Sequence, residues 1–221
     1  MKTLRAQLRD VIQQEMTQDP AHDVLHLDRV WANAHRIAKD EGGINLRVLV
    51  AAAYLHDLVN LPKNHPDRKL ASAMSAEKAE PILAKLGYSA EDIAAAQHAI
   101  TTHSYSAKLE PKSREAVILR DADRLDALGA VGIARTFMVA GQMDRPLADP
   151  RDPFAAKRAL DDQLWSIDHW HLKLLQLPHE MATRKGRKIA RKRAKLMLAY
   201  LQQLAKEMDT ELPAHWSELL E

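Results

Sequence analysis

A histidine and an aspartate stand side by side at the end of an almost wholly apolar stretch. Residues 46–58 read LRVLVAAAYLHDL, and His56 with Asp57 supplies the first ionisable pair after Arg47. An unpaired charge in a buried helix costs several kcal/mol, so a partner must compensate this pair. A divalent cation is an economical partner, because neutral imidazole and carboxylate both bind metals of borderline or hard character. The pair is therefore the first candidate for a metal site.

Two further segments offer ligands for such a site. His26 lies between two leucines in DVLHLDRVWANA, near the start of a predicted helix. In AVILRDADRLDALG the aspartates are residues 121, 123 and 126. A helix advances about 100° per residue, so Asp123 and Asp126 are neighbours, whereas Asp121 points away from Asp123. Each residue taken singly is more often a core or solvated side chain than a ligand, but their combination is far less expected by chance.

The composition restricts the chemistry. The 221 residues include no cysteine, which removes disulfides, thiolate catalysis and thiolate-bound zinc. Any metal site must therefore use histidines and carboxylates. The N-terminal MKTLRAQLRD lacks the apolar stretch of a signal peptide, and no apolar run approaches the about 20 residues of a membrane span. We expect a cytoplasmic protein with no membrane partner.

The charges are nearly balanced overall but locally concentrated. Thirty-two basic and 30 acidic residues give a formal charge of +2, which does not indicate a nucleic-acid partner. Residues 184–195, RKGRKIARKRAK, are strongly basic, yet Ile189, Met197 and Leu201 recur at helical spacing. We expect an amphipathic helix with a solvated basic face. RNA and anionic lipid are the alternative partners, although the segment has no aromatic residue for base stacking.

Apolar spacing and punctuation predict an all-α chain with no strand. The length suits one domain, and the scarcity of glycine and aromatic residues favours helices. Asp23 and Ser89 are placed to cap helices, and Gly42 and Gly87 to end them. Residues 59–68 and 141–153 should be loops. Helices are expected over about 3–17, 23–41, 46–58, 70–86, 89–103, 114–127, 129–140, 155–177 and 179–208.

The order of these residues resembles the HD-domain superfamily of metal-dependent phosphohydrolases. Its pattern is a histidine, a His-Asp doublet and a distant aspartate, matched here by HLDRV at 26–30, AAYLHDL at 52–58 and LRDADRLDALGA at 119–130. The loop HDLVNLPKN and the segment AITTHSYSA are similar to small stand-alone bacterial members. The earlier doublet, His22-Asp23, opens a helix and is taken as a decoy. The resemblance implies a single-domain HD-type helical bundle over 1–221, with a metal-site core at 20–140 and C-terminal helices 155–208 packing on it.

The resemblance also implies a ligand set and a reaction. His26, His56, Asp57 and Asp123 would bind a divalent metal such as Mn, Mg, Co or Ni. The substrate would be a small phosphorylated molecule, a nucleotide by resemblance. Asp57 could accept a proton from the attacking water.

Cationic groups should bind the remaining phosphate oxygens. His103 is a candidate catalytic residue, and the candidates for substrate binding are Lys63, His65, His98 and Arg124. Asn60 stands where several nucleotidases of the superfamily carry a catalytic glutamate, so their proton-transfer scheme cannot be copied.

Several alternatives remain open at this point. The same ligands serve a nucleoside-triphosphate pyrophosphohydrolase, which differs in the phosphorus attacked. A non-catalytic nucleotide-binding regulatory HD module would show lost ligands, and none is lost here. His98 and His103 also keep open a second metal or a di-iron oxygenase. A homodimer is neither indicated nor excluded.

Overall fold

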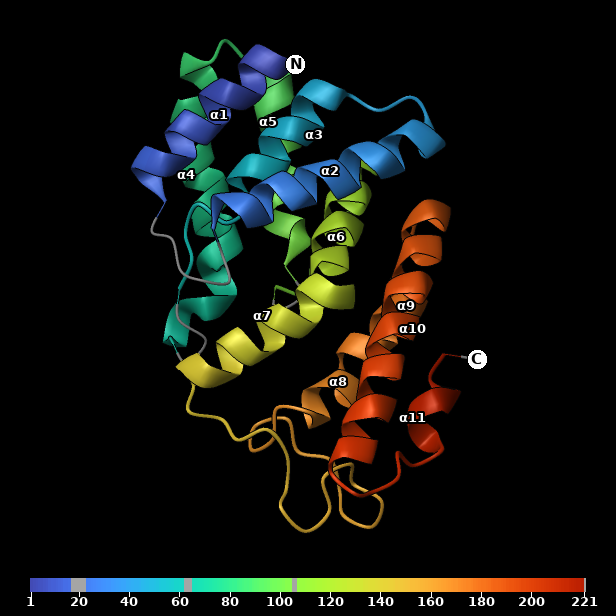
Figure 1. Ribbon diagram of the computed structural model, residues 1–221. Helices are drawn as coiled ribbons and strands as arrows, with labels where there is room; N and C mark the ends of the chain where they lie inside the picture. The colour runs from blue at the N-terminus through green and yellow to red at the C-terminus, as the bar shows by residue number, and fades with distance from the viewer. Residues whose placement is uncertain (17–22, 62–64, 105–106, 221) are drawn as a thin grey trace. The chain divides into compact units, whose positions relative to one another are not determined.

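The computed structural model describes residues 1–16, 23–61, 65–104 and 107–220 (Figure 1). Over these residues the secondary structure consists of helices, turns and loops without a strand, which confirms the all-α prediction. The chain forms two compact units, Met1–Asp123 and Arg124–Glu221. The boundary between them lies within one helix, α6 (Arg114–Asp126).

The first unit is built around the apolar helix predicted to lie in the core. Every side chain of α3 from Val48 to Leu55 is buried. This helix contacts α1, α2, α4 and α5 (Figure 1), so its whole circumference is covered as its composition requires. The bounds are α1 Lys2–Glu15, α2 Val24–Glu41, α3 Leu46–Leu55, η1 Pro66–Leu70, α4 Ala71–Lys85 and α5 Ala90–His103, followed by α6.

Side-chain caps fix where two of these helices begin. The Asp23 carboxylate accepts a hydrogen bond from the amide of His26 at 2.8 Å, and the Ser89 hydroxyl accepts one from the amide of Asp92 at 3.1 Å. Both predicted caps are confirmed. The cap at Asp23 also places His26 in the first turn of α2.

The third helix is shorter than its apolar sequence predicts. It ends at Leu55 rather than Leu58, and the amide of Leu58 bonds back to the carbonyl of Leu55 in a tight turn. His56 and Asp57 therefore lie just beyond the last helical turn. This leaves their side chains free to face a site instead of a neighbouring helix.

The second unit centres on the long helix α10. Its buried side chains include Ala190, Ala194 and Met197, and it contacts α7 and α9. Gly129 at the start of α7 has a φ of 76°, and a Cβ there would lie 3.1 Å from the Arg193 side chain. The bounds are α7 Gly129–Gln142, α8 Asp168–Leu172, η2 Leu174–Gln176, α9 Leu177–Glu180, α10 Arg184–Glu207 and α11 His215–Glu218.

The prediction of one long helix over residues 155–177 is wrong. Residues 143–167 are irregular, and only short helices follow before α10. The Asp152 carboxylate accepts hydrogen bonds from the amides of Ala156, Lys157 and Arg158, which replace helical bonds there. The buried carboxylate of Asp168 then binds the Arg158 guanidinium at 2.8 Å.

Two further expectations concern membrane-spanning helices and the number of domains. Among the described residues, no helix is both long enough and apolar enough to cross a membrane. The packing of residues 155–208 on the first unit, as part of one domain over 1–221, stays a prediction.

Candidate metal centre

Five side chains from four helices of the first unit meet in one cluster. His26 comes from the first turn of α2, His56 and Asp57 follow α3, His103 is the last residue of α5, and Asp123 lies on α6. His26, His56 and His103 are buried. We call these five residues the His-Asp cluster.

Within the His-Asp cluster the imidazole nitrogens lie close to the carboxylate oxygens. The Nε2 atom of His26 lies 3.5 Å from Asp123 Oδ1 and 3.6 Å from Asp57 Oδ2. The Nε2 atom of His56 lies 3.5 Å from Asp57 Oδ2 and 3.8 Å from Asp123 Oδ1. His103 Nε2 lies 3.7 Å from the other oxygen of Asp57, Oδ1. Asp57 is therefore the residue that faces all three histidines.

Backbone carbonyl groups orient two of the imidazoles. Nδ1 of His56 donates to the carbonyl of Ala53 at 3.1 Å, and Nδ1 of His103 donates to the carbonyl of Ile100 at 2.5 Å. A carbonyl can only accept, so each Nδ1 bears the hydrogen. In the neutral ring, Nε2 then presents its lone pair to the cluster, which is the arrangement that a metal ligand needs.

The donor set fits a divalent cation. His56 Nε2 is buried and makes no hydrogen bond within the described part of the chain. The carboxylate oxygens beside it are at or beyond the outer limit of hydrogen-bonding distance. Donor atoms of His26, His56 and Asp123 lie within 4.8 Å of one another, and so do those of His56, Asp57 and His103. A cation among these atoms would satisfy the buried nitrogen and both carboxylates together.

The imidazoles and carboxylates of the cluster shift one another's pKa values. Burial alone would lower the pKa of His56, but the carboxylates of Asp57 and Asp123 outweigh it and raise this pKa to about 9, so a metal bound at Nε2 would replace a proton there. Burial likewise opposes charge on Asp57 and Asp123. The neighbouring imidazoles outweigh burial and lower the pKa of both carboxyl groups well below their ordinary value. Both aspartates are therefore ionised at neutral pH and able to bind a cation.

The cluster is open on its carboxylate side. The side chain of Asp57 is 21% exposed and that of Asp123 29%, whereas those of His26 and His56 are 1% exposed or less. A small anionic molecule could therefore approach the metal ligands from the carboxylate side, while the histidines form the enclosed base.

The region of this chain that matches a known family contains the His-Asp cluster. A family model described as the HD domain matches residues 24–128, which include all five residues of the His-Asp cluster. The uncharacterized protein YpgQ of Bacillus subtilis (strain 168) is 34% identical over 215 residues, covering 94% of this chain and 96% of that protein. This chain belongs to the HD-domain superfamily.

Solved HD structures share the fold over nearly the whole chain. The crystal structure of Bacillus subtilis YpgQ in complex with ADP has a TM-score of 0.71 and 33% identity, covering 96% of this chain and 99% of that one. An HD-superfamily hydrolase from Bacillus thuringiensis has a TM-score of 0.69 and 28% identity, covering 95% and 97% of the two chains. A predicted HD superfamily hydrolase from an uncultured Thermotogales bacterium has a TM-score of 0.59 and 27% identity, with 91% of each chain covered. The chain is thus an HD-family protein with hydrolase relatives.

The other residues predicted to serve this HD site differ in their positions. Nε2 of His98 accepts a hydrogen bond from the amide of Lys112 at 2.9 Å, so this histidine is not part of the His-Asp cluster. His65 caps η1, its Nδ1 accepting from the amide of Asp67 at 3.1 Å. Lys63 lies outside the described residues.

Two further residues near the HD ligand positions belong to the second unit or its boundary. Arg124 begins that unit, and its guanidinium lies 3.3 Å from a carboxylate oxygen of Glu180. Asp126 pairs with Arg135 at 2.9 Å. Substrate contacts of Arg124, like those of His65, His98 and Lys63, stay predictions.

Sequence reasoning missed the residues whose hydrogen bonds hold the segments that carry the HD site. Nδ2 of the buried Asn33 donates to the carbonyl of Ala122 at 3.4 Å and so links α2 to the position before Asp123. The hydroxyl of Ser75 accepts from the amide of Val59 at 3.0 Å and anchors the loop after the doublet to α4. A polar residue on an otherwise apolar helix face was the available signal for Asn33. No pattern marks the carbonyls of Ala53 and Ile100.

Proposed function

We propose that the protein is a divalent-metal-dependent phosphohydrolase that acts on phosphate esters or anhydrides of nucleotides. His26, His56, Asp57 and Asp123 would bind the metal. The observation that supports this most directly is the convergence of imidazole Nε2 atoms on two ionised carboxylates at a partly open site. A bound divalent cation would supply Lewis-acid activation of water and of a phosphate oxygen.

The residues of the chain would supply orientation and proton transfer. One oxygen of Asp57 faces His26 and His56 and the other faces His103. Its carboxylate can therefore accept a proton from the attacking water while the opposite oxygen stays beside an imidazole. His103, oriented by the carbonyl of Ile100, can take up a proton at Nε2, and the protonated ring can then donate a hydrogen bond from Nε2 to a phosphate oxygen.

The nucleotide part of the proposal rests on the relatives. YpgQ of Bacillus subtilis was crystallised with ADP, and this chain aligns with nearly all of that structure. The anionic oxygens of a phosphoanhydride would be repelled by the carboxylates of Asp57 and Asp123. A cation between them would remove this repulsion, which is consistent with the proposed metal. Release of phosphate and release of pyrophosphate are both compatible with this site.

The test is a product assay with metal-stripped protein. The chain is resupplied with Mn²⁺, Mg²⁺, Co²⁺ or Ni²⁺, and phosphate and pyrophosphate are measured separately over a panel of nucleoside mono-, di- and triphosphates. We expect metal-dependent turnover that Asp57→Asn lowers by at least about 100-fold, because the same carboxylate binds metal and accepts the proton. Asp10→Asn, at an exposed aspartate of α1, is the matched control and should keep full activity.

The products decide between the enzymatic alternatives. Pyrophosphate from triphosphates would indicate a pyrophosphohydrolase, and phosphate a phosphatase. Absence of turnover with every metal, together with tight nucleotide binding, would overturn the proposal in favour of a regulatory module.

A further inference from the structure

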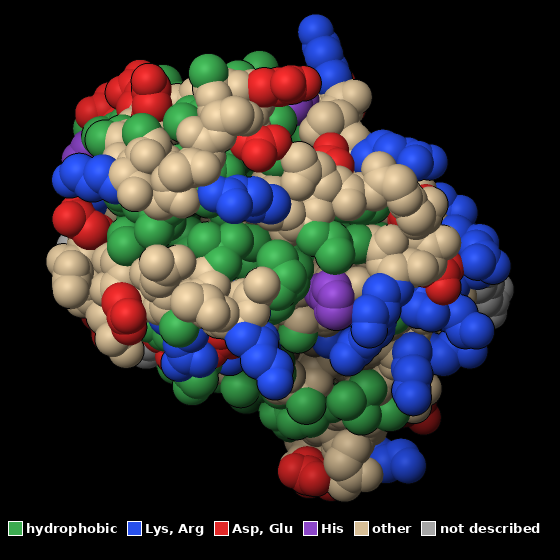
Figure 2. Space-filling model, turned by 90° about the horizontal axis from the view of Figure 1, so that it is seen from above, with side chains coloured by type: hydrophobic (Ala, Val, Ile, Leu, Met, Phe, Trp, Pro, Cys, Tyr) green, Lys and Arg blue, Asp and Glu red, His purple; other side chains and the backbone are tan. Residues whose placement is uncertain are grey.

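The first half of α10 presents an uninterrupted basic stripe. Its side chains are spaced by three or four residues, so they follow one face of the helix. All of them are exposed. Figure 2 shows Lys and Arg side chains gathered at the right-hand side of the face that it draws. The basic stripe consists of Arg184, Arg187, Lys188, Arg191, Lys192 and Lys195.

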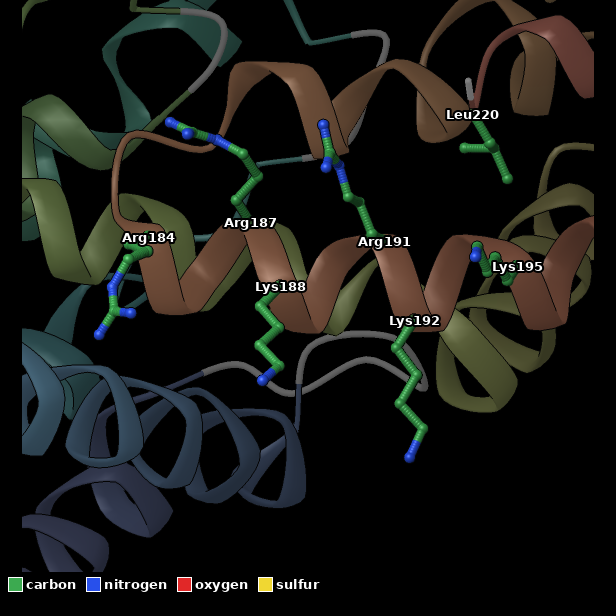
Figure 3. Close-up of a pocket in the computed structure, with 7 residues that line it drawn as sticks. All are labelled: Arg184, Arg187, Lys188, Arg191, Lys192, Lys195 and Leu220. Atoms are coloured by element: carbon green, nitrogen blue, oxygen red, sulfur yellow. The ribbon is translucent and has the colours of Figure 1, made fainter.

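The basic stripe lines a groove rather than a flat surface. The six cationic residues and Leu220, near the end of the chain, enclose an open groove of about 600 Å³. Figure 3 shows Arg187 and Arg191 leaving α10 on the side of Leu220 and Lys188 and Lys192 leaving it on the other side. A ligand lying along α10 could therefore be contacted from two sides.

This arrangement of charge opposes the stability of the helix. Like charges three and four residues apart repel one another, and cations near the N-terminus of a helix oppose its dipole. The first turn of α10 contains no acidic residue. Within the described residues, Lys188, Arg191, Lys192 and Lys195 form no ion pair with a carboxylate. An anionic ligand would remove the repulsion that the fold leaves uncompensated.

The shape and composition of the stripe favour one class of anion. From Arg184 to Lys195 the helix rises by about 16 Å, which matches about five phosphates along one strand of a B-form duplex. The opposite face of α10, with Ala190, Ala194 and Met197, is buried in the unit and cannot insert into a bilayer. No aromatic residue lies in the basic stripe, so bases have no platform for stacking.

We propose that the basic stripe binds the phosphate backbone of double-helical nucleic acid without sequence preference. The net charge of +2 does not reveal the basic stripe, because acidic residues outside residues 184–195 balance it. Backbone recognition uses only the cationic side chains, and DNA and RNA duplexes share the required chemistry.

The experiment is fluorescence anisotropy with the full-length chain and labelled 20-base-pair duplexes. DNA and RNA duplexes, each in two unrelated sequences, are titrated at several salt concentrations from 50 to 200 mM. We expect equal affinity for the two sequences and a linear fall of log affinity with log salt. For about five neutralised phosphates the slope on DNA should be about −4 to −5. The DNA and RNA arms show which duplex binds more tightly.

Two double variants with the same change in net charge separate the stripe from the total charge. Lys188→Glu with Lys192→Glu should weaken binding at least about tenfold and reduce the slope by about 2, because two phosphate contacts are lost. Lys157→Glu with Lys206→Glu, at exposed lysines of the same unit, should change the affinity less than about threefold. The thermal midpoint of the first variant should be unchanged or higher, since repulsion along α10 is reduced.

Three results would overturn the proposal. They are no duplex binding at 50 mM salt, equal loss of binding in both double variants, and stripe-dependent binding to phosphatidylserine vesicles without binding to duplexes. The vesicle result would assign the stripe to a membrane surface.

Discussion

At the scale of single residues, the neighbours His56 and Asp57 have different surroundings. The His56 ring is fully enclosed and has its Nδ1 bound to a carbonyl, so only Nε2 faces the site. Asp57 is partly exposed and faces three imidazoles with its two oxygens. These surroundings support the proposal that His56 serves only as a metal ligand, whereas Asp57 both binds the metal and accepts the proton.

His103 allows the ligand and catalytic roles to be separated. If this residue acts on the substrate, His103→Gln should lower kcat by about 100-fold and leave the metal content of the purified protein unchanged. Metal content measured by mass spectrometry, together with steady-state kinetics, tests this. Loss of metal in His103→Gln, to the same extent as in His56→Gln, would instead make His103 a ligand.

At the scale of elements, most of the helices could be predicted because their signals are local. The caps at Asp23 and Ser89 and the apolar run of α3 each lie within one segment of sequence. The loop over residues 143–153 was predicted, but the irregular stretch 155–167 was missed because its bonds join Arg158 to Asp168 ten residues on. Such a pairing leaves no periodic pattern.

The same distinction applies to the candidate site. The spacing of His26, His56, Asp57 and Asp123 could be read from the sequence, and the structure brings all four together. The position of His98 outside the cluster depends on a backbone amide fourteen residues on, which side-chain identity does not reveal.

The contact between α8 and α11 predicts a dependence of stability on pH. The ring of His171 lies 5.0 Å from the rings of both His215 and Trp216. Burial, and secondarily the charge of His215, lower the pKa of His171 below its ordinary value of 6.5. The unfolded chain therefore binds this proton more readily. The stability present above about pH 6.5 is lost as the pH falls through the lowered folded-state pKa.

We expect His171→Phe to reduce the loss of stability between about pH 7 and pH 5, since the ring contacts remain and the titration does not. Urea midpoints of the two proteins at both pH values provide the measurement. The other titrating groups are common to both proteins and cancel in the comparison. An equal shift in midpoint for both would contradict the assignment to His171.

At the scale of the whole molecule, all the candidate ligands are residues of the first unit, and they lie on or directly after four helices. A metal that binds only the folded chain, at 100 times its Kd, stabilises it by about 2.7 kcal/mol. Hydrogen exchange should then slow by up to about 100-fold at residues 24–30, 50–57 and 117–123 when Mn²⁺ is added. Residues 190–205 of α10 should change little.

Mass-spectrometric peptide exchange with and without Mn²⁺ tests this expectation. Asp123→Asn should remove the protection, because the carboxylate from α6 is then missing. Protection by Mn²⁺ confined to α10 would place the metal outside the His-Asp cluster.

The boundary between the two compact units falls between Asp123 and Arg124, in the last turn of α6. A fragment that stops at the boundary would end on a proposed ligand and expose the last carbonyls of a truncated helix. A fragment that begins there would lack the first turns of the same helix. Dissecting this protein by truncation would therefore damage both halves, and single substitutions are the better route to assigning their separate roles.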